Sequence, residues 1–131
     1  MEDLSKYVSH YVAKLEGPDG GNAFHTLREA GAAALPYLAV ALRNAPAPGV
    51  RKLIVEVMWQ SREPSVVSIL AIALDDPAPE VWKEALDGLV TIGDSSASAV
   101  LRSALARSRR GELGVPSEWL TEAIEQVETQ Q

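Results

Sequence analysis

The sequence predicts an all-α protein, a short α-solenoid of about eight antiparallel helices. Three observations support this fold class. The chain repeats itself at a fixed interval, its apolar residues recur at the three- and four-residue spacing of helices, and no segment alternates apolar and polar residues as a strand does. The 131 residues are 47% hydrophobic and 23% charged, which suits a single folded domain over residues 1–131.

The repeat interval is 31 residues. Residues 44–51 (NAPAPGVR) fall on residues 75–82 (DDPAPEVW) when the chain is shifted by 31 positions, so that two Pro-Ala-Pro motifs coincide. The same shift places Gly31 on Arg62 and keeps the apolar residues of the two segments in register. A fixed period of about 20 to 50 residues is the signature of a solenoid.

The first 31 residues are expected to form two N-terminal cap helices. A helix over residues 4–16 is followed by the run 17–21 (GPDGG), whose composition is typical of a turn. A second helix then extends to Gly31, which marks a helix stop. These helices would cover the first repeat.

Three helix pairs are expected to follow, over residues 33–61, 64–92 and 95–128. Proline suits the first turn of a helix, where its missing N–H costs nothing. Four prolines are therefore interpreted as helix starts: Pro48, Pro64, Pro79 and Pro116.

The remaining signals concern helix ends and the core. Gly93 and Gly111 mark stops, and Asp94, Ser95 and Ser96 offer an N-cap for the next helix. The apolar stripes of the helices are expected to meet in one core. Its predicted members are Leu38, Leu42, Ile54, Leu70, Leu74, Ala85, Leu89, Leu101 and Leu105.

The run 76–81 (DPAPEV), followed by Ala85, Leu86 and Leu89, resembles the turn and second helix of a HEAT-type repeat. That family's signature is an Asp, four residues, Val-Arg and then a ladder of Ala and Leu. The resemblance covers residues 23–106 and implies a right-handed superhelix of units that pack on their neighbours. The interval is shorter than the ~40–47 residues usual for HEAT arrays and is similar to that of compact bacterial HEAT-like units.

The resemblance also predicts one structural ion pair. In HEAT repeats, the Asp of one unit meets the Arg of its neighbour. Here Ala45 replaces one Asp and Trp82 replaces one Arg, so that Arg51 and Asp76 are the surviving members. We expect Arg51 and Asp76 to pair, with Asp75 as the competitor for the same guanidinium.

The sequence offers no catalytic or metal-binding pattern. It contains no cysteine, and its two histidines, His10 and His25, lack the following Glu of the His-Glu pairs that metal-binding HEAT-like hydroxylases use. It also contains no Gly-x-Ser-x-Gly elbow and no phosphate loop with Lys-Ser/Thr. We therefore predict a protein that is not an enzyme and that needs no metal and no cofactor.

Charge and hydropathy restrict the partners. The 12 Lys and Arg against 18 Asp and Glu give a net charge of −6, which disfavours nucleic acid because phosphate binding needs a basic face. No segment reaches the ~18 apolar residues of a membrane span, and the N-terminus lacks the basic start and apolar run of a secretory signal. We expect a cytoplasmic protein with neither a nucleic-acid nor a membrane partner.

The concave face is the candidate binding surface, because the second helix of each unit lines it in the family that the chain resembles. The repeat offset arranges polar positions in rows across this face. The predicted partner-binding residues are Arg28, Lys52, Glu56, Trp59, Gln60, Lys83, Asp87, Thr91 and Glu125. A solvated helix face is the simpler interpretation of the same pattern.

Two aromatic residues and a basic stretch have alternative interpretations. Trp59 is either an interface anchor beside charges or a residue that closes the gap between helices. Trp119 is expected to cover the open end of the solenoid. The basic stretch either binds an acidic partner or is solvated near a helix C-terminus, and it contains Arg102, Arg107, Arg109 and Arg110.

These features favour a non-catalytic protein-binding module that holds a protein partner on the concave face. One version is an inhibitor or immunity-type protein against a basic partner, because an acidic face attracts cations. The alternative is an accessory protein, similar to chaperone- and lyase-like HEAT families, that acts on a pigment- or cofactor-bearing protein. That alternative requires an apolar cleft with a few convergent polar groups.

Overall fold

The computed structural model describes residues 3–130, which form eight α-helices, one 3₁₀-helix and no strand. The helices are α1 (Leu4–Val12), α2 (Gly20–Ala30), η1 (Gly31–Ala34), α3 (Leu35–Asn44), α4 (Pro48–Gln60), α5 (Val66–Ala73), α6 (Pro79–Ile92), α7 (Ser95–Arg109) and α8 (Ser117–Gln130). The predicted all-α class and the helix number are confirmed.

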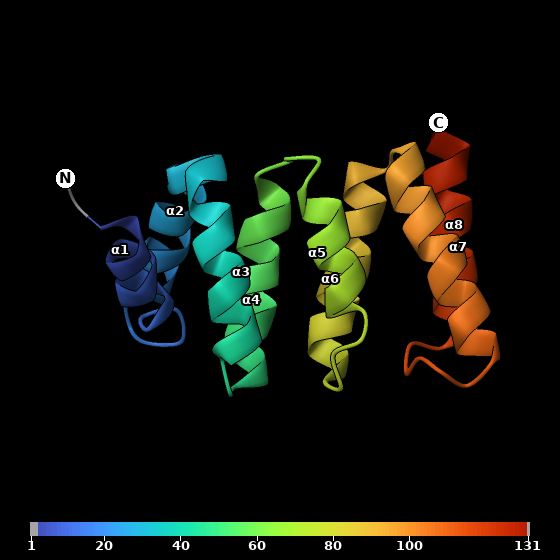
Figure 1. Cartoon of the computed structure of the whole chain (residues 1–131), viewed down its shortest axis with the longest axis horizontal. Coiled ribbons are helices and arrows are strands. Elements are labelled where there is room, and N and C mark those ends of the chain that lie inside the picture. The colour runs from blue at the N-terminus through green and yellow to red at the C-terminus, as the bar shows by residue number, and fades with distance from the viewer. Residues whose placement is uncertain (1–2, 131) are drawn as a thin grey trace.

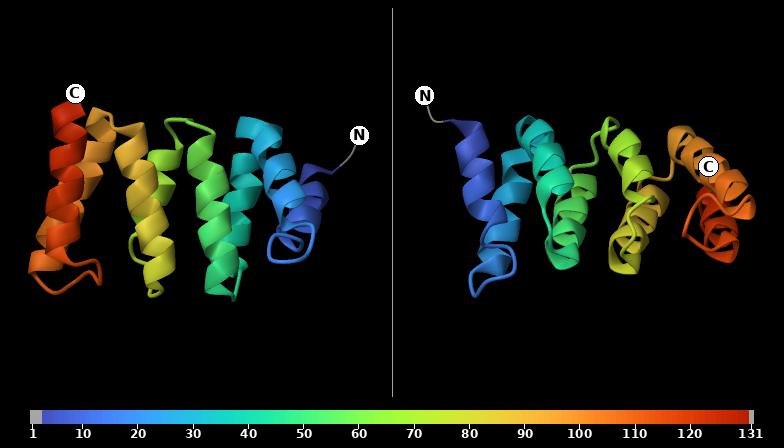
Figure 2. Two further views of the ribbon diagram at one scale, coloured as in Figure 1. Left: turned by 180° about the vertical axis from the view of Figure 1, so that it is seen from behind. Right: turned by 60° about the horizontal axis from the view of Figure 1, so that its bottom comes forward.

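The helices alternate between two layers. The A layer consists of α1, α3, α5 and α7 and faces the viewer in Figure 1, whereas the B layer consists of α2, α4, α6 and α8 and faces the viewer when the molecule is seen from behind (Figure 2). Most successive helices within a layer pack side by side, as α4 does with α6 and α5 with α7, whereas α3 and α5 hardly touch. A row of units that contact their neighbours is a solenoid, as the repeat predicts.

Two helices are shorter than predicted because their ends tighten into turns. α1 ends at Val12, and Lys14 and Leu15 then donate backbone hydrogen bonds to residues three positions earlier. α5 begins at Val66 and not at the predicted Pro64, which lies in a turn, and it ends at Ala73, where Asp75 N donates to Ile72 O at 3.0 Å. α5 is also the most apolar helix, yet none of the helices within residues 3–130 combines the length and apolarity needed to cross a bilayer.

The repeat extends to the backbone conformation at the helix ends. Gly31, Arg62 and Gly93 are spaced by 31 residues and have φ angles of 69°, 59° and 63°. A residue with positive φ commonly ends a helix, and glycine adopts this conformation without the penalty of a Cβ atom. Arg62 therefore occupies a position that its two equivalents fill with glycine.

The helix after Gly93 begins with the expected N-cap. Asp94 Oδ1 accepts hydrogen bonds from Ala97 N at 2.9 Å and from the Ser96 hydroxyl at 2.7 Å. The backbone hydrogen bond, and then the hydroxyl, lower the pKa of the Asp94 carboxyl. The anionic cap also suits the positive end of the α7 dipole.

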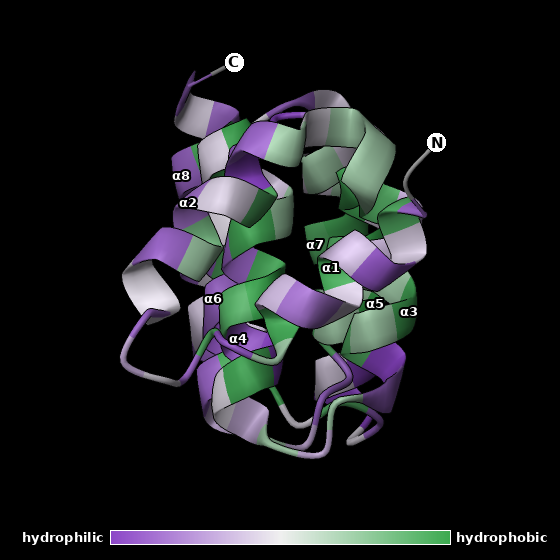
Figure 3. Ribbon diagram, turned by 90° about the vertical axis from the view of Figure 1, so that its left-hand side faces the viewer, coloured by the Kyte–Doolittle hydropathy of each residue, from purple (hydrophilic) through white to green (hydrophobic). Residues whose placement is uncertain are grey.

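The core lies where the two layers meet (Figure 3). Of the predicted core residues, Leu38, Leu42, Ile54, Leu70, Leu74, Ala85, Leu89 and Leu101 are buried. The prediction for Leu105 is wrong, because this residue is only partly buried and its neighbour Ala104 is buried instead. α7 is the last A-layer helix in the described part of the chain, so one of its sides has no neighbouring helix.

Candidate functional site

Acidic side chains are concentrated on the B layer. The four A-layer helices contain no Asp or Glu, whereas the B-layer helices contain 9 acidic against 4 basic residues. The A-layer helices carry Lys6, Arg43, Arg102, Arg107 and Arg109. The acidic residues of the B layer are Glu29, Glu56, Glu80, Glu84, Asp87, Glu118, Glu122, Glu125 and Glu128. The surface of the B layer is therefore the side that attracts cations.

A polar network links α2 to α4 on this surface. Arg28 donates to Gln60 Oε1 at 3.2 Å and to His25 Nδ1 at 3.0 Å, and Gln60 Nε2 donates to Glu56 at 3.4 Å. Because His25 Nδ1 accepts a hydrogen bond from Arg28, its Nε2 carries the hydrogen and faces Glu29 Oε1 at 3.1 Å. The network contains three of the predicted site residues, Arg28, Glu56 and Gln60. Their side chains are hydrogen-bonded to one another.

Trp59 closes the gap between α4 and α6. Its indole Nε1 donates to Glu84 Oε1 at 2.9 Å. Its side chain lies against Gly88, where a methyl group would lie only 2.8 to 2.9 Å from Cβ, Cγ and Cδ1 of Trp59. Trp59 is accordingly partly buried, and it fills a gap between helices and is not an exposed anchor.

Glu84 on α6, a carboxylate that is only 8% exposed, is not among the residues predicted from the sequence. Burial raises its pKa, and the charges of Glu56 and Asp87 raise it further, whereas the hydrogen bond from Trp59 and the charge of Lys52 lower it. A signal was present in the repeat, because Glu84 falls on Leu53 at the 31-residue offset. An apolar residue at the equivalent position indicates partial burial.

Asp87 lies one helical turn after Glu84 on α6. The residue as a whole is exposed, yet its carboxyl group is partly covered, and this burial raises the pKa of Asp87. The charge of the half-buried Lys52 on α4 lowers the same pKa. Lys52, Glu84 and Asp87 thus form a charged seam between α4 and α6.

A groove with a volume of about 260 Å³ separates α6 from α8. One wall consists of Leu86, Asp87, Val90 and Thr91 on α6, and the other of Trp119, Glu122, Ala123 and Gln126 on α8. The α8 residues recur at three- and four-residue spacing and so share one face of that helix. Two predicted site residues, Asp87 and Thr91, line this groove.

Trp119 stands in the groove, so its predicted role as a cover for the open end is wrong. The indole packs edge-to-face on Trp82 of α6, with ring centroids 5.4 Å apart, and the residue remains 45% exposed. Lys83 Nζ lies 5.2 Å from the centroid of the same ring. Through its contact with Trp82, Trp119 faces the preceding unit and not the open end of the solenoid.

The last helix pair is held by polar groups. Glu128 of α8 accepts hydrogen bonds from the Ser98 hydroxyl at 2.7 Å and from Arg102 Nε at 2.7 Å. These hydrogen bonds, first that from Arg102, lower the pKa of Glu128. A polar outer side is what the terminal repeat of a solenoid needs.

The basic stretch at the end of α7 is largely neutralised. Arg107 pairs with Asp75 at 2.6 Å, and Arg110 pairs with Glu112 at 2.9 Å in the following loop. With Arg102 paired to Glu128, three of the four arginines have acidic partners. The structure therefore favours the solvated alternative over a free basic patch.

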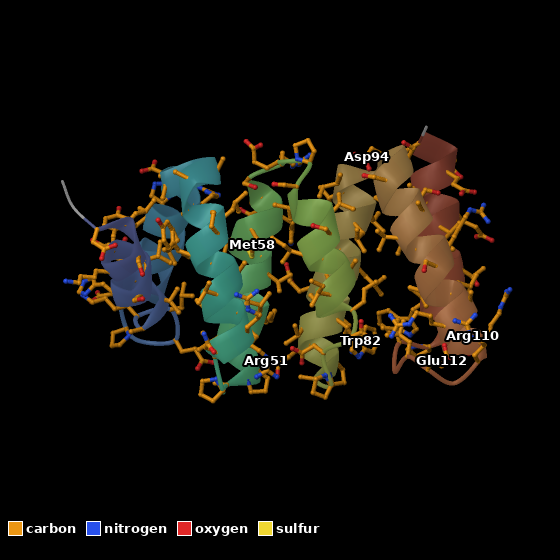
Figure 4. All side chains as sticks on the ribbon, viewed as in Figure 1. Arg51, Met58, Trp82, Asp94, Arg110 and Glu112 are labelled. Atoms are coloured by element: carbon orange, nitrogen blue, oxygen red, sulfur yellow. The ribbon has the colours of Figure 1, made fainter. Side chains whose placement is uncertain are left out.

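The structure contains the expected pair between Arg51 and Asp76. The contact is bidentate, at 2.8 and 3.1 Å, and the side chains are only 15% and 12% exposed. The hydrogen bond to Asp76 raises the pKa of Arg51. Asp75 does not compete, because it binds Arg107. Trp82, one repeat after Arg51, lies like Arg51 toward the lower edge of the helices in Figure 4 and contacts Trp119 instead of an acid.

Three further predicted residues complete the surface. Lys83 is exposed beside the two indoles, and Thr91 donates its hydroxyl hydrogen to Asp87 O at 2.7 Å. Glu125 is exposed on α8 but does not line the groove, where Glu122 faces Asp87 instead. No group of three His, Cys, Asp or Glu side chains that could hold a metal ion occurs within residues 3–130.

The comparison with known families identifies one match. Residues 35–113 match the family model of HEAT repeats, a segment that covers more than half of the chain and extends from α3 through α7. No curated protein and no solved structure gave a significant match.

Proposed function

Because the chain belongs to the HEAT repeat family, whose members generally mediate protein–protein interactions, we propose that it is a non-catalytic module that binds a basic protein partner on the B layer. The observation that carries this proposal is the separation of charge between the two layers. A cationic partner is attracted to the B-layer helices, which carry nine acidic against four basic residues, and not to the A-layer helices, which carry no acidic residue.

The form of this function that best suits the charge pattern is inhibition of a basic protein, as in an inhibitor or immunity-type protein. An acidic surface accelerates the encounter with a basic toxin or nuclease and covers the cationic face that such a protein uses. The alternative, an accessory protein for a pigment- or cofactor-bearing partner, needs an apolar cleft. The groove between α6 and α8 has a carboxylate on each wall, which supports the first form.

Affinity capture from the native cell extract tests the proposal with two charge-reversed variants. Glu56→Lys combined with Glu125→Lys changes the B layer, and Lys6→Glu combined with Arg43→Glu changes the A layer at exposed or half-buried positions. We expect one stoichiometric basic protein with the wild type and the A-layer variant, and its loss with the B-layer variant. An acidic captured partner, or loss with the A-layer variant alone, contradicts the proposal, and a coloured preparation favours the accessory alternative.

A further inference from the structure

We propose that the groove between α6 and α8 is an arginine-binding site, in which the guanidinium of a partner arginine stacks on Trp119 and pairs with Asp87 and Glu122. The inference rests on the proposed function and names the side chain that the B layer recognises.

The aromatic wall of the groove is the first support. Trp119 is 45% exposed, whereas Trp82 beside it is 7% exposed. The edge-to-face contact with Trp82 fixes the orientation of the Trp119 ring, and the exposed Lys83, whose Nζ lies 5.2 Å from its centroid, is the cation that an incoming arginine would displace. An indole that is held in place and partly solvated is a ready surface for a cation–π contact.

The second support is a pair of carboxylates that are not held in close ion pairs within residues 3–130, although the charge of Lys52 acts on one of them, Asp87. Asp87 comes from α6 and Glu122 from α8, so they face the groove from opposite walls. Neither forms a salt bridge within residues 3–130, in contrast to Glu128, which binds Arg102. The carboxyl group of Asp87 is also partly covered by protein, so an incoming cation would replace solvation that this group has lost.

Shape and chemistry favour arginine over other cations. The groove volume of about 260 Å³ lies just below the ~300–1,000 Å³ of pockets for drug-sized ligands, so it suits one long side chain better than a cofactor. A guanidinium is planar and can stack on an indole while its fork donates to carboxylates, whereas an ammonium is a strongly hydrated point charge. Ala123 leaves room for such a group between the two walls.

The test is a titration of the ¹⁵N-labelled protein with hexa-arginine and with hexa-lysine at low ionic strength, followed by NMR. The three indole N–H signals report separately on Trp59, Trp82 and Trp119. We expect hexa-arginine to shift the Trp119 signal and to leave the Trp59 signal in place, because Trp59 is bonded to Glu84. Hexa-lysine, which has the same charge, should bind about three- to ten-fold more weakly, the ratio expected from loss of stacking.

Matched variants identify the groove as the site. Glu122→Gln and Trp119→Leu should each weaken hexa-arginine binding by about three- to ten-fold. Glu118→Gln, an equal charge change on an exposed residue of the same helix outside the groove, should leave it within about two-fold of the wild type. An unchanged Trp59 signal shows that each variant is folded. The Trp82 signal is a second control for Glu122→Gln and Glu118→Gln only, because Trp119→Leu removes the ring that packs on Trp82.

The outcomes separate this inference from the proposed function. Shifts that gather on α2 and α4 while Trp119 is unmoved overturn the groove but leave a basic partner on the B layer intact. Equal effects of hexa-lysine and hexa-arginine, or of Glu118→Gln and Glu122→Gln, overturn the specific arginine site. Shifts confined to the A layer, or no binding of either peptide, overturn both.

Discussion

Two neighbouring gaps in the B layer each receive a tryptophan, with opposite results. Between α4 and α6, Trp59 lies against Gly88 and donates to the buried Glu84, so the gap is closed. Between α6 and α8, Trp119 packs edge-to-face with Trp82 and stays half exposed beside an open groove. The same residue type is a structural filler in one gap and lines an open groove in the next, where we propose that it binds a partner.

The contacts that link consecutive units also differ between these two gaps. Arg51 of α4 reaches Asp76 in the turn before α6, and this bidentate pair is largely shielded from water. Trp82, at the equivalent position one repeat later, reaches Trp119 on α8. The Arg51–Asp76 link is a directional pair of hydrogen bonds that holds α4 close to the turn before α6. The Trp82–Trp119 link is a ring contact, beside which the groove stays open.

The core beneath both gaps should be the most sensitive region. Leu70 of α5 is fully buried, so Leu70→Ala should lower the free energy of unfolding by about 2–5 kcal/mol, the range for a truncated core leucine. Chemical denaturation of both proteins measures the difference. A midpoint equal to that of the wild type would mean that α5 is placed incorrectly.

One added methyl group at Gly88 should disrupt the packing of Trp59 in the closed gap. Alanine in place of glycine inside a helix normally stabilises it by about 1 kcal/mol, but Gly88→Ala would clash with Trp59 and should cost about 1–3 kcal/mol by overpacking. In a Trp59→Ala background the same change should become stabilising. Thermal unfolding of the four proteins checks this, and a stabilising Gly88→Ala in the wild-type background would show that Trp59 does not fill the gap.

The directional link is isolated by a double-mutant cycle. Arg51→Ala and Asp76→Ala should show a coupling energy of about 1–2 kcal/mol, above the range of exposed pairs because the contact is bidentate and shielded. The cycle is needed since Asp76 also accepts a hydrogen bond from Ala78 N at 2.9 Å. The exposed pair Arg110–Glu112 is the control, with about 0–1 kcal/mol expected. Additive single effects at Arg51 and Asp76 would contradict the link.

Most of the fold could be predicted from the sequence because one repeat interval controls several levels of structure. The offset of 31 residues relates the Pro-Ala-Pro turns, the buried positions and the positive φ angles of Gly31, Arg62 and Gly93. Helix ends were predicted less well where the last turn tightens, as after Val12 and Ala73. Such a change depends on single hydrogen bonds that periodicity does not describe.

The candidate site was only partly predictable. The offset selected Asp87 and Thr91, which line the groove, and also Arg28, Glu56 and Gln60, which form the network between α2 and α4. It missed the roles of Glu122 and Trp119, because the loop before α8 breaks the register that relates the other units. It also left Trp59 with two interpretations, since only the packing against α6 distinguishes a filler from an anchor.

The smallest expected effect concerns Glu84, the buried carboxylate in the closed gap between α4 and α6. Glu84→Gln keeps an oxygen that can accept the hydrogen bond from Trp59 and removes a charge that burial disfavours, so it should raise the free energy of unfolding at pH 7 by less than about 1 kcal/mol. Because the folded-state pKa of Glu84 is raised above its ordinary value of 4.5, the folded protein binds more protons than the unfolded chain between 4.5 and that raised pKa. Glu84 therefore makes the wild type less stable as the pH rises through this window, and the variant lacks this dependence of the free energy of unfolding on pH.

Denaturation at a series of pH values should show the two proteins equally stable below the window and the variant more stable above it. Glu118→Gln, on exposed α8 surface, should show no such divergence. A variant that is less stable at pH 7 would mean that the charge-assisted hydrogen bond from Trp59 outweighs the burial of the carboxylate.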